Sequence, residues 1–245
     1  MLAQQRPQLQ FRSGAVFAWL PTITSVSRQA IFAGKLPIYF PVSIHKTDKE
    51  DSLWKQFWAD QGFSLVEVAY AKGLGEASTL SKVEEVLSHP KVRVVGLVVD
   101  KVDKIMHGME LGTPGMHNQV RQWAVQGFMA NLLDLLHDHN FRVFITSDHG
   151  NIEATGIGRP AEGAIADLRG ERVRVYPDQT LRAKVKADFP SAIEWAPLGL
   201  PEDYLPLLAP RRSAFVPSGK RIVAHGGISL EELVVPFIQI EGRNQ

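Results

Sequence analysis

The sequence predicts an α/β protein in which a mostly parallel sheet is covered by helices on both faces, as a three-layer α/β/α sandwich. Apolar runs that suit strands alternate along the chain with stretches of helical periodicity. Residues 92–99 are almost wholly apolar, which is typical of a strand buried on both faces of a parallel sheet. The segment 78–88 has the apolar spacing and the capped start of a helix.

The remaining elements follow from the same patterns. Further strands are expected at residues 15–20, 38–44, 63–70, 141–146, 172–176 and 234–240. Further helices are expected at residues 25–33, 49–60, 116–139 and 179–189. The strand at 15–20 should be buried and should end at Pro21, and the helix that follows should end at Gly34. The Pro-rich segment 190–217 is interpreted as an excursion from the sheet, so residues 1–245 are expected to form one domain.

Composition restricts the chemistry that the chain can perform. The 245 residues carry a formal net charge of +1, which gives no argument for binding nucleic acid or a membrane surface. The N-terminus has no apolar signal sequence and no run reaches membrane-spanning length, so we expect a cytoplasmic protein. The chain has no cysteine, which excludes disulfides, thiolate metal sites and cysteine nucleophiles. A metal would need His, Asp, Glu or hydroxyl ligands, which suit zinc, manganese or magnesium.

Thr24 is the candidate nucleophile, because it lies at the predicted turn from a strand to a helix. Unpaired backbone N–H groups and the helix dipole favour negative charge at this place, on an alkoxide or a phosphoryl oxygen. Without a neighbouring base, the hydroxyl needs a bound metal to lose its proton near neutral pH. The alternative is that Thr24 only caps the helix, which is the commonest role of a threonine at such a position.

The first cluster of ligand-type residues follows the apolar strand at 92–99. Asp103 and His107 lie a few residues beyond the predicted end of this strand, where open α/β sheets place their sites. Asp100 stands at the strand end itself and is an alternative to Asp103 as a ligand. The alternative for the whole cluster is a solvated loop, because this spacing is common by chance.

Two more clusters of ligand-type residues lie in glycine-containing turns. Asp148 and His149 directly follow the predicted strand at 141–146, where they are either ligands or part of an Asx turn. His225 precedes two glycines, which allow the backbone to approach another group closely, and a capping box at the start of a helix. A lone histidine is more often structural than a ligand, so each cluster alone is weak evidence.

Taken together, four motifs make the sequence resemble a known family. The segments PTITSVSRQAIFAG, DKIMH, TSDHGN and HGG occur in this order. In order and separation they resemble the alkaline phosphatase superfamily of two-metal hydrolases. Within that superfamily the chain is most similar to PglZ-type proteins of bacterial BREX phage-defence systems, through PTITSVSRQAIFAGKLP and the ending HGGISLEELVVPF. The resemblance extends from about residue 15 to residue 240 and implies an alkaline-phosphatase-like fold.

The resemblance implies roles for two residues near the start of the chain. Thr24 matches the metal-bound nucleophile of the superfamily, and attack by its hydroxyl would form a phosphoryl-threonine that water then hydrolyses. Arg28 matches an arginine that lies near the substrate anion in the sulfatase branch. Thr22, Ser25 and Ser27 are alternative hydroxyls, but Thr24 has Arg28 four residues later, as the pattern requires.

The resemblance also implies two metal sites. Asp103, His107 and His225 match the ligands of one ion, and Asp148 and His149 match ligands of the other ion together with the threonine nucleophile. Two divalent ions roughly 3.5 to 4 Å apart activate a nucleophilic oxygen and stabilise a leaving oxygen. Zinc is the expected metal, with manganese or magnesium as alternatives.

One departure from the superfamily pattern affects both the fold and the function. The pattern requires a further aspartate on the first strand, upstream of the nucleophile, but no Asp or Glu precedes Asp48. Either the chain is an N-terminally truncated domain that lacks its first strand, or it is complete and its second metal site is short of a ligand. We expect the truncated domain, which should expose an apolar slot and have poor solubility.

The expected function is a metal-dependent phosphoesterase, first of all a phosphodiesterase, in a BREX system. Its expected partners are a phosphate-ester substrate and other defence proteins. The alternative is a catalytically inactive scaffold or nucleotide-sensing protein of the same defence complex, which the missing carboxylate favours.

Overall fold

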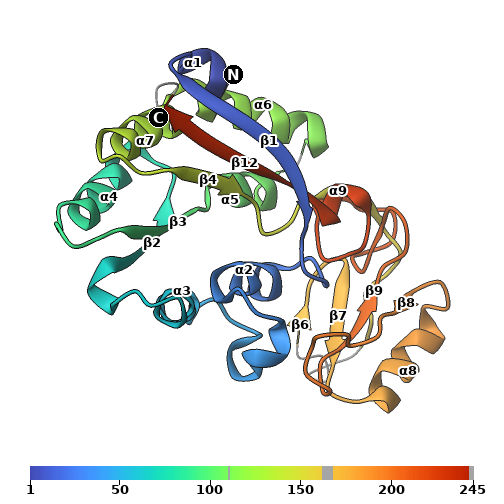
Figure 1. Cartoon of the computed structure of the whole chain (residues 1–245). Coiled ribbons are helices and arrows are strands. Elements are labelled where there is room, and N and C mark those ends of the chain that lie inside the picture. Colours follow the sequence, from blue (N-terminus) through green and yellow to red (C-terminus); the bar gives the residue numbers. More distant parts are fainter. Residues whose placement is uncertain (110, 162–167, 243–245) are drawn as a thin grey trace. The chain divides into compact units, whose positions relative to one another are not determined.

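The computed structural model describes residues 1–109, 111–161 and 168–242 (Figure 1). These residues form two compact units, each of which is assembled from segments far apart in the sequence. The first unit comprises Met1–Val16, Asp51–Thr146 and Pro236–Gln245. The second unit comprises Phe17–Glu50 and Ser147–Val235. Within the described ranges, no helix combines the length and the apolar character that crossing a bilayer would require.

The first unit contains most of the long helices. Its helices are α1 (Leu2–Gln5), most of α3 (Glu50–Asp60), α4 (Leu80–Leu87), α5 (Lys101–His107), α6 (Gly112–Val125) and α7 (Phe128–Asp138). Two 3-10 helices, Leu65–Glu67 and Ala77–Thr79, precede β2 and α4. Its strands are most of β1 (Leu9–Phe17), β2 (Val68–Leu74), β3 (Val94–Val99), β4 (Val143–Thr146) and most of β12 (Val234–Gly242).

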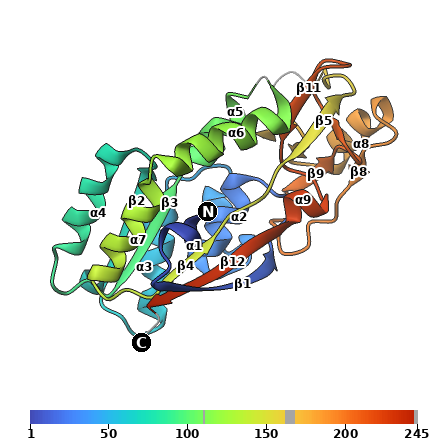
Figure 2. The same cartoon turned by 90° about the horizontal axis from the view of Figure 1, so that it is seen from above.

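The strands of the first unit form two small sheets. β2 and β3 form a parallel pair and lie side by side in Figure 2. Helix α4 lies in the crossover connection between them and packs against β2. The other sheet has the order β1-β12-β4, in which β12 and β4 are antiparallel. One face of this sheet packs against α7 through a core cluster of Leu9, Leu133 and Ile240.

The second unit carries the remaining elements. Its helices are α2 (Thr24–Ala33), α8 (Gln179–Asp188) and α9 (Leu230–Leu233), together with two 3-10 helices, Pro37–Tyr39 and Pro41–Ser43. Its strands are β5 (Ile152–Gly156), β6 (Leu168–Arg169), β7 (Val173–Tyr176), β8 (Ile193–Glu194), β9 (Leu205–Leu208), β10 (Ser213–Ala214) and β11 (Arg221–Ala224).

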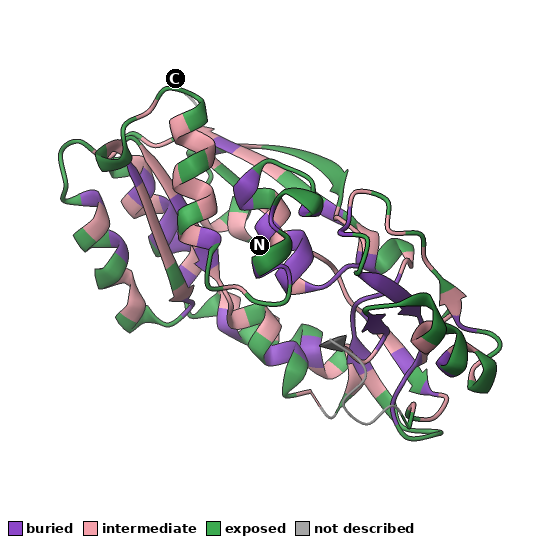
Figure 3. Ribbon diagram, turned by 90° about the horizontal axis from the view of Figure 1, so that it is seen from below, coloured by how far each residue is buried: buried purple, intermediate pink, exposed green. Residues whose placement is uncertain are grey.

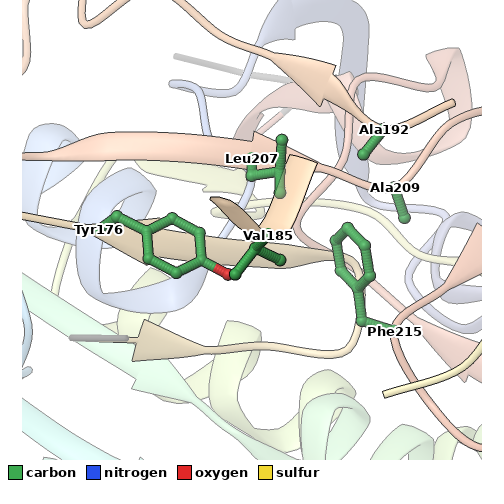
Figure 4. Packing of buried hydrophobic residues seen from close by; sticks show 6 residues of the cluster. All are labelled: Tyr176, Val185, Ala192, Leu207, Ala209 and Phe215. Carbon is green, nitrogen blue, oxygen red and sulfur yellow. The ribbon is translucent and has the colours of Figure 1, made fainter. Parts of the chain in front are cut away.

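The core of the second unit lies under a four-stranded sheet of order β6-β7-β9-β8, whose pairs are all antiparallel. Strands β7 and β9 are buried along their whole length and are purple in Figure 3. Helix α8 covers them through a cluster that includes Tyr176, Val185 and Phe215 (Figure 4). A second sheet, β10-β5-β11, combines a parallel and an antiparallel pair.

Several predicted elements are confirmed. Helix α2 ends at Gly34, which has the left-handed φ of 57° that glycine adopts without strain. The helices α3, α4 and α8 and the strands β3, β4, β7 and β12 occur where the sequence predicts them, within a few residues. The α/β class is therefore correct.

The single, mostly parallel sheet is not what the described residues form. They build four small sheets, and antiparallel pairs join β12 to β4, β11 to β5, β6 to β7, and β9 to both β7 and β8. Segment 190–217 is also more ordered than an irregular excursion, because it contributes β8, β9 and β10. Short antiparallel strands carry too few residues for a reliable periodicity, which explains why the sequence did not reveal them.

The predicted buried strand at 15–20 is wrong in both position and burial. The observed strand β1 runs from Leu9 to Phe17, and most of its residues are exposed. Phe17 is 75% exposed. β1 is an edge strand of its sheet, with β12 as its neighbour on one side, which leaves much of its surface uncovered.

Two further predicted elements, a strand and a long helix, are wrong because of prolines and a glycine. The predicted strand at 38–44 is replaced by the two 3-10 helices, which start at Pro37 and Pro41, because proline has no N–H for a sheet and fixes a turn-like φ. The predicted long helix at 116–139 is two helices, α6 and α7, that meet at Gly127 with a φ of 85°. This positive φ lies outside the right-handed helical region, so the helix is interrupted at Gly127.

Candidate metal centre

Thr24 is the first residue of α2 and follows the extended residue Ile23. Its Oγ1 lies 3.1 Å from Nε2 of His149. The neighbouring hydroxyls are placed differently, because Thr22, Ser25 and Ser27 are all buried whereas Thr24 is partly exposed. Thr24 therefore combines access to solvent with a contact to an imidazole.

The remaining hydroxyls at this turn have other surroundings. Thr22 donates its hydroxyl hydrogen to the carbonyl of Gly227 at 2.7 Å, and Ser27 donates to the carbonyl of Trp19 at 2.8 Å. Oγ of Ser25 is buried and has no hydrogen-bond partner within the described ranges. The first two hydroxyls hold the turn in place.

His149 presents an acceptor nitrogen to Thr24. Its Nδ1 lies 2.9 Å from the carbonyl oxygen of Gly150. A carbonyl oxygen only accepts hydrogen bonds, so Nδ1 carries the hydrogen and Nε2 of the neutral ring carries a lone pair. Nε2 can therefore accept the hydroxyl hydrogen of Thr24 or coordinate a metal ion.

His225 is also oriented by a hydrogen bond from its Nδ1 to a backbone carbonyl. Its Nδ1 lies 2.9 Å from the carbonyl oxygen of Thr22, which again assigns the hydrogen to Nδ1 and the lone pair to Nε2. The rings of His225 and His149 are stacked, with centroids 3.8 Å apart and planes 8° apart. A ligand nitrogen of one ring lies within 4.8 Å of a ligand nitrogen of the other.

Asp148 adds a carboxylate beside the ring of His149. Its Oδ1 accepts the backbone N–H of His149 at 3.2 Å, and its Oδ2 lies 3.8 Å from Nε2 of His149. The side chain is 20% exposed, so the carboxylate is accessible from solvent. Asp148 follows the end of β4 directly, as predicted for a site at the end of a strand.

Donor atoms of the kinds that suit a divalent metal ion gather around His149 in the second unit. They comprise two imidazole nitrogens held in the correct tautomer, one carboxylate and one hydroxyl, contributed by His149, His225, Asp148 and Thr24. Backbone carbonyls that accept from Nδ1 are the usual partners of metal-binding histidines. Nitrogen and oxygen donors of this kind suit zinc or manganese better than calcium.

Asp103 and His107 lie in the first unit, on α5 and not in the solvated loop that was the alternative interpretation. The spacing of four residues places them on one face of the helix, and Nε2 of His107 is 3.5 Å from Oδ1 of Asp103. This oxygen of Asp103 has no hydrogen-bond partner in the part of the chain that is described. Asp100, the alternative ligand, is paired with Lys104 at 2.9 Å.

Arg28 is bonded to a carboxylate. Its Nε donates to Oε1 of Glu50 at 2.6 Å, and the side chain of Glu50 is fully buried. The Arg28 side chain is 16% exposed. No local pattern in the sequence indicates this partner, because Glu50 is separated from Arg28 by 22 residues and stands at the start of α3.

Sequence reasoning also missed the residues that support the two histidine loops. These residues are Thr22, Arg172 and Glu232, which are all buried. Thr22 forms hydrogen bonds with Gly226 and Gly227. Glu232 accepts hydrogen bonds from Gly227 and Arg172. A capping box at Ser229–Glu232 was recognisable, but the partner Arg172 is 60 residues away, and no local pattern identifies it.

Comparisons with known proteins agree with the motifs. The family described as the BREX system PglZ alkaline phosphatase-like domain matches residues 1–240. No curated protein matches the sequence.

Solved structures with a similar fold include murine ectonucleotide pyrophosphatase/phosphodiesterase 5, at 12% identity and a TM-score of 0.65, covering 91% of this chain and 78% of that one. The same values hold for an inactive threonine-to-alanine variant of the murine protein in complex with AMP. The human protein gives a TM-score of 0.61 at 12% identity and covers 92% of this chain and 78% of that one. The fold is therefore alkaline-phosphatase-like.

Proposed function

The chain belongs to the family of PglZ alkaline phosphatase-like domains of BREX systems, and on this premise we propose that it is a metal-dependent phosphoesterase with Thr24 as its nucleophile. A phosphodiesterase is the first choice. The observation that carries the proposal is the placement of Thr24 Oγ1 at 3.1 Å from Nε2 of His149, whose ring is stacked on that of His225. The structure of the inactive threonine-to-alanine variant of the murine phosphodiesterase supports the choice of a threonine.

The protein's own groups prepare the reaction before any substrate binds. The carbonyls of Gly150 and Thr22 hold hydrogens on the Nδ1 atoms, so that both Nε2 lone pairs are available at one place. The start of α2 contributes unpaired N–H groups and a positive dipole end near the hydroxyl of Thr24. Divalent metal ions, when bound, would favour the deprotonated hydroxyl and stabilise charge on the phosphate oxygens.

In the proposed first step, Oγ1 of Thr24 forms a bond to phosphorus and the bond from phosphorus to the leaving oxygen breaks. The hydroxyl proton of Thr24 is released, and the leaving oxygen takes up a proton. Water then hydrolyses the phosphoryl-threonine and restores the hydroxyl. Accessibility supports Thr24 over its neighbours, because Thr22, Ser25 and Ser27 are buried.

We assign the metal ligands as the motifs imply. Asp148 and His149 would hold one ion together with the threonine, and Asp103, His107 and His225 would hold the other. Zinc is the favoured metal and manganese or magnesium the alternatives, because the donors are nitrogen and oxygen without thiolate. We propose that residues 1–245 act as one catalytic domain, on a phosphate-ester substrate and together with other BREX proteins.

The alternative function is that of an inactive scaffold or nucleotide sensor in the same system. The complex of AMP with the inactive murine variant supports this alternative, because a protein of similar fold there holds a nucleotide while inactive. A nucleotide sensor would keep the helix N-terminus and the histidines for binding phosphate and metal, but would turn over no substrate.

Hydrolysis of bis(p-nitrophenyl) phosphate tests the proposal. Turnover should require added zinc or manganese, stop with chelator and be lost in Thr24→Ala. Thr180→Ala is the matched control, because Thr180 is an exposed threonine in the first turn of α8. If the folded, metal-loaded protein shows no turnover, or if Thr24→Ala is as active as Thr180→Ala, the proposed function is wrong.

A further inference from the structure

Glu232 connects the two loops that carry His149 and His225. Its main-chain carbonyl accepts the N–H of Gly150, the residue after His149, at 2.8 Å. Its side-chain Oε1 accepts the N–H of Gly227, two residues after His225, also at 2.8 Å. One residue of α9 therefore bonds to both loops.

The carboxylate of Glu232 is itself held firmly. Arg172 donates from Nε to Oε1 at 2.7 Å and from Nη2 to Oε2 at 3.0 Å, and Ser229 donates to Oε2 from its hydroxyl at 2.8 Å and from its N–H at 3.1 Å. The Glu232 side chain is fully buried and that of Arg172 is 1% exposed. Burial alone would raise the pKa of Glu232, but the hydrogen bonds and the charge of Arg172, helped by Gly227 and Ser229, hold this pKa below its ordinary value.

The contacts at both glycines are too close for a side chain. A Cβ on Gly150 would collide with the carbonyl of Glu231, and a Cβ on Gly227 would collide with the side chains of Arg172 and Glu232. Both loops therefore pack directly against α9 and its buried ion pair.

A third anchor connects this arrangement to the nucleophile turn. Thr22 Oγ1 donates to the carbonyl of Gly227 and accepts the N–H of Gly226, while its own carbonyl accepts from Nδ1 of His225. Thr22 lies two residues before Thr24. A chain of hydrogen bonds therefore connects the nucleophile turn, the loops of both histidines and Glu232, and the two imidazoles lie 3.8 Å apart with planes 8° apart.

We propose that Glu232, held by Arg172, is a positioning residue that fixes the distance and orientation between the His149 and His225 rings. The part of the proposal that concerns metal binding rests on the proposed function. Glu232 touches neither substrate nor metal, and it acts through the backbone of the two loops. Positioning partners of metal-binding histidines typically change metal affinity by about 10- to 100-fold when they are removed.

Two measurements separate positioning from simple stabilisation. The first is the zinc affinity of the full chain, measured by competition with a chelator in Glu232→Gln and in the matched control Glu231→Gln. Glu231 is the adjacent glutamate, but it is half-exposed and pairs with Arg212. Zinc binding should weaken about 10- to 100-fold in Glu232→Gln and stay unchanged in Glu231→Gln.

The second measurement is nitrogen NMR of the imidazoles in the metal-free protein, which needs no activity. The wild type should show both rings with the hydrogen on Nδ1. Glu232→Gln should show mixed tautomers for His225 while its circular dichroism spectrum stays that of the wild type. Should Glu232→Gln fail to fold, Arg172→Met/Glu232→Leu removes both buried charges and preserves apolar volume, so it provides a second folded test.

The zinc affinities and the tautomers together decide between the interpretations. Wild-type zinc affinity and wild-type tautomers in a folded Glu232 variant would overturn the proposal, and so would failure of both variants to fold, which would make Glu232 a stability residue only. If the wild type binds no zinc but the tautomers of His225 change as expected, the metal-dependent function fails and the positioning role stands.

Discussion

The buried pair of Arg28 and Glu50 allows a quantitative prediction. In Arg28→Met, the fully buried carboxylate of Glu50 loses the guanidinium that donates to it at 2.6 Å. Removing one partner of a buried ion pair costs about 3 to 5 kcal/mol, and we expect about 3 kcal/mol because Glu50 lies at the positive end of α3. For a chain of this size, about 3 kcal/mol corresponds to a fall in Tm of about 6 to 12 °C.

Thermal unfolding and steady-state kinetics of the same variants test this prediction. The double variant Arg28→Met/Glu50→Met removes both charges and should recover most of the lost stability. The control Lys55→Met breaks a partly exposed pair with Asp51, whose partners are four residues apart on α3, and should change the free energy of unfolding by about 0.5 kcal/mol or less. If Arg28 also contacts the substrate anion, KM stays raised in the stable double variant. A Tm of Arg28→Met equal to that of Lys55→Met would refute the reasoning.

The remaining predictions concern the network around α9. Arg172→Met should lower the free energy of unfolding, measured with denaturant, by about 3 to 5 kcal/mol. Arg212→Met, at an exposed arginine, should lower it by less than about 1 kcal/mol. Equal losses in the two variants would contradict the structure. Because the pKa of Glu232 is depressed, its contribution to stability is present above 4.5, its ordinary pKa, and is lost as the pH falls through the lower folded-state value. Unfolding of the wild type should therefore become more acid-sensitive than that of Glu232→Gln; parallel pH profiles would exclude this. Gly150→Ala should destabilise by about 1 to 3 kcal/mol and weaken zinc binding, because its Cβ meets the Glu231 carbonyl; a variant with wild-type stability and zinc affinity would show that the loop can move.

The sequence predicted well those parts of the fold that local rules decide. Gly34 ends α2 because only a residue tolerant of a positive φ fits there, and the apolar run of β3 becomes a parallel strand beside β2. The errors occurred where tertiary structure decides. Nothing local shows that β1 would be an edge strand with an exposed Phe17, and the antiparallel strands β8 and β10 are only two residues long.

The candidate site was predictable to a similar extent. The motifs located Thr24, Asp148, His149 and His225, and the structure places these four residues in the same unit. The supporting contacts were not predictable, because they join residues far apart in the chain. The side chain of Glu232 reaches Arg172, 60 residues away. Hydrogen bonds of this kind follow from the folded backbone and leave no periodic signal in the sequence.

The most direct test of the account is the identity of the residue that becomes covalently modified during turnover. Bis(p-nitrophenyl) phosphate would be mixed with the zinc-loaded protein, the reaction stopped with acid, and the peptides analysed by mass spectrometry. We expect a nitrophenyl-phosphoryl or phosphoryl group on Thr24 and none in Thr24→Ala. Turnover that leaves Thr24 unmodified and persists in Thr24→Ala would contradict it.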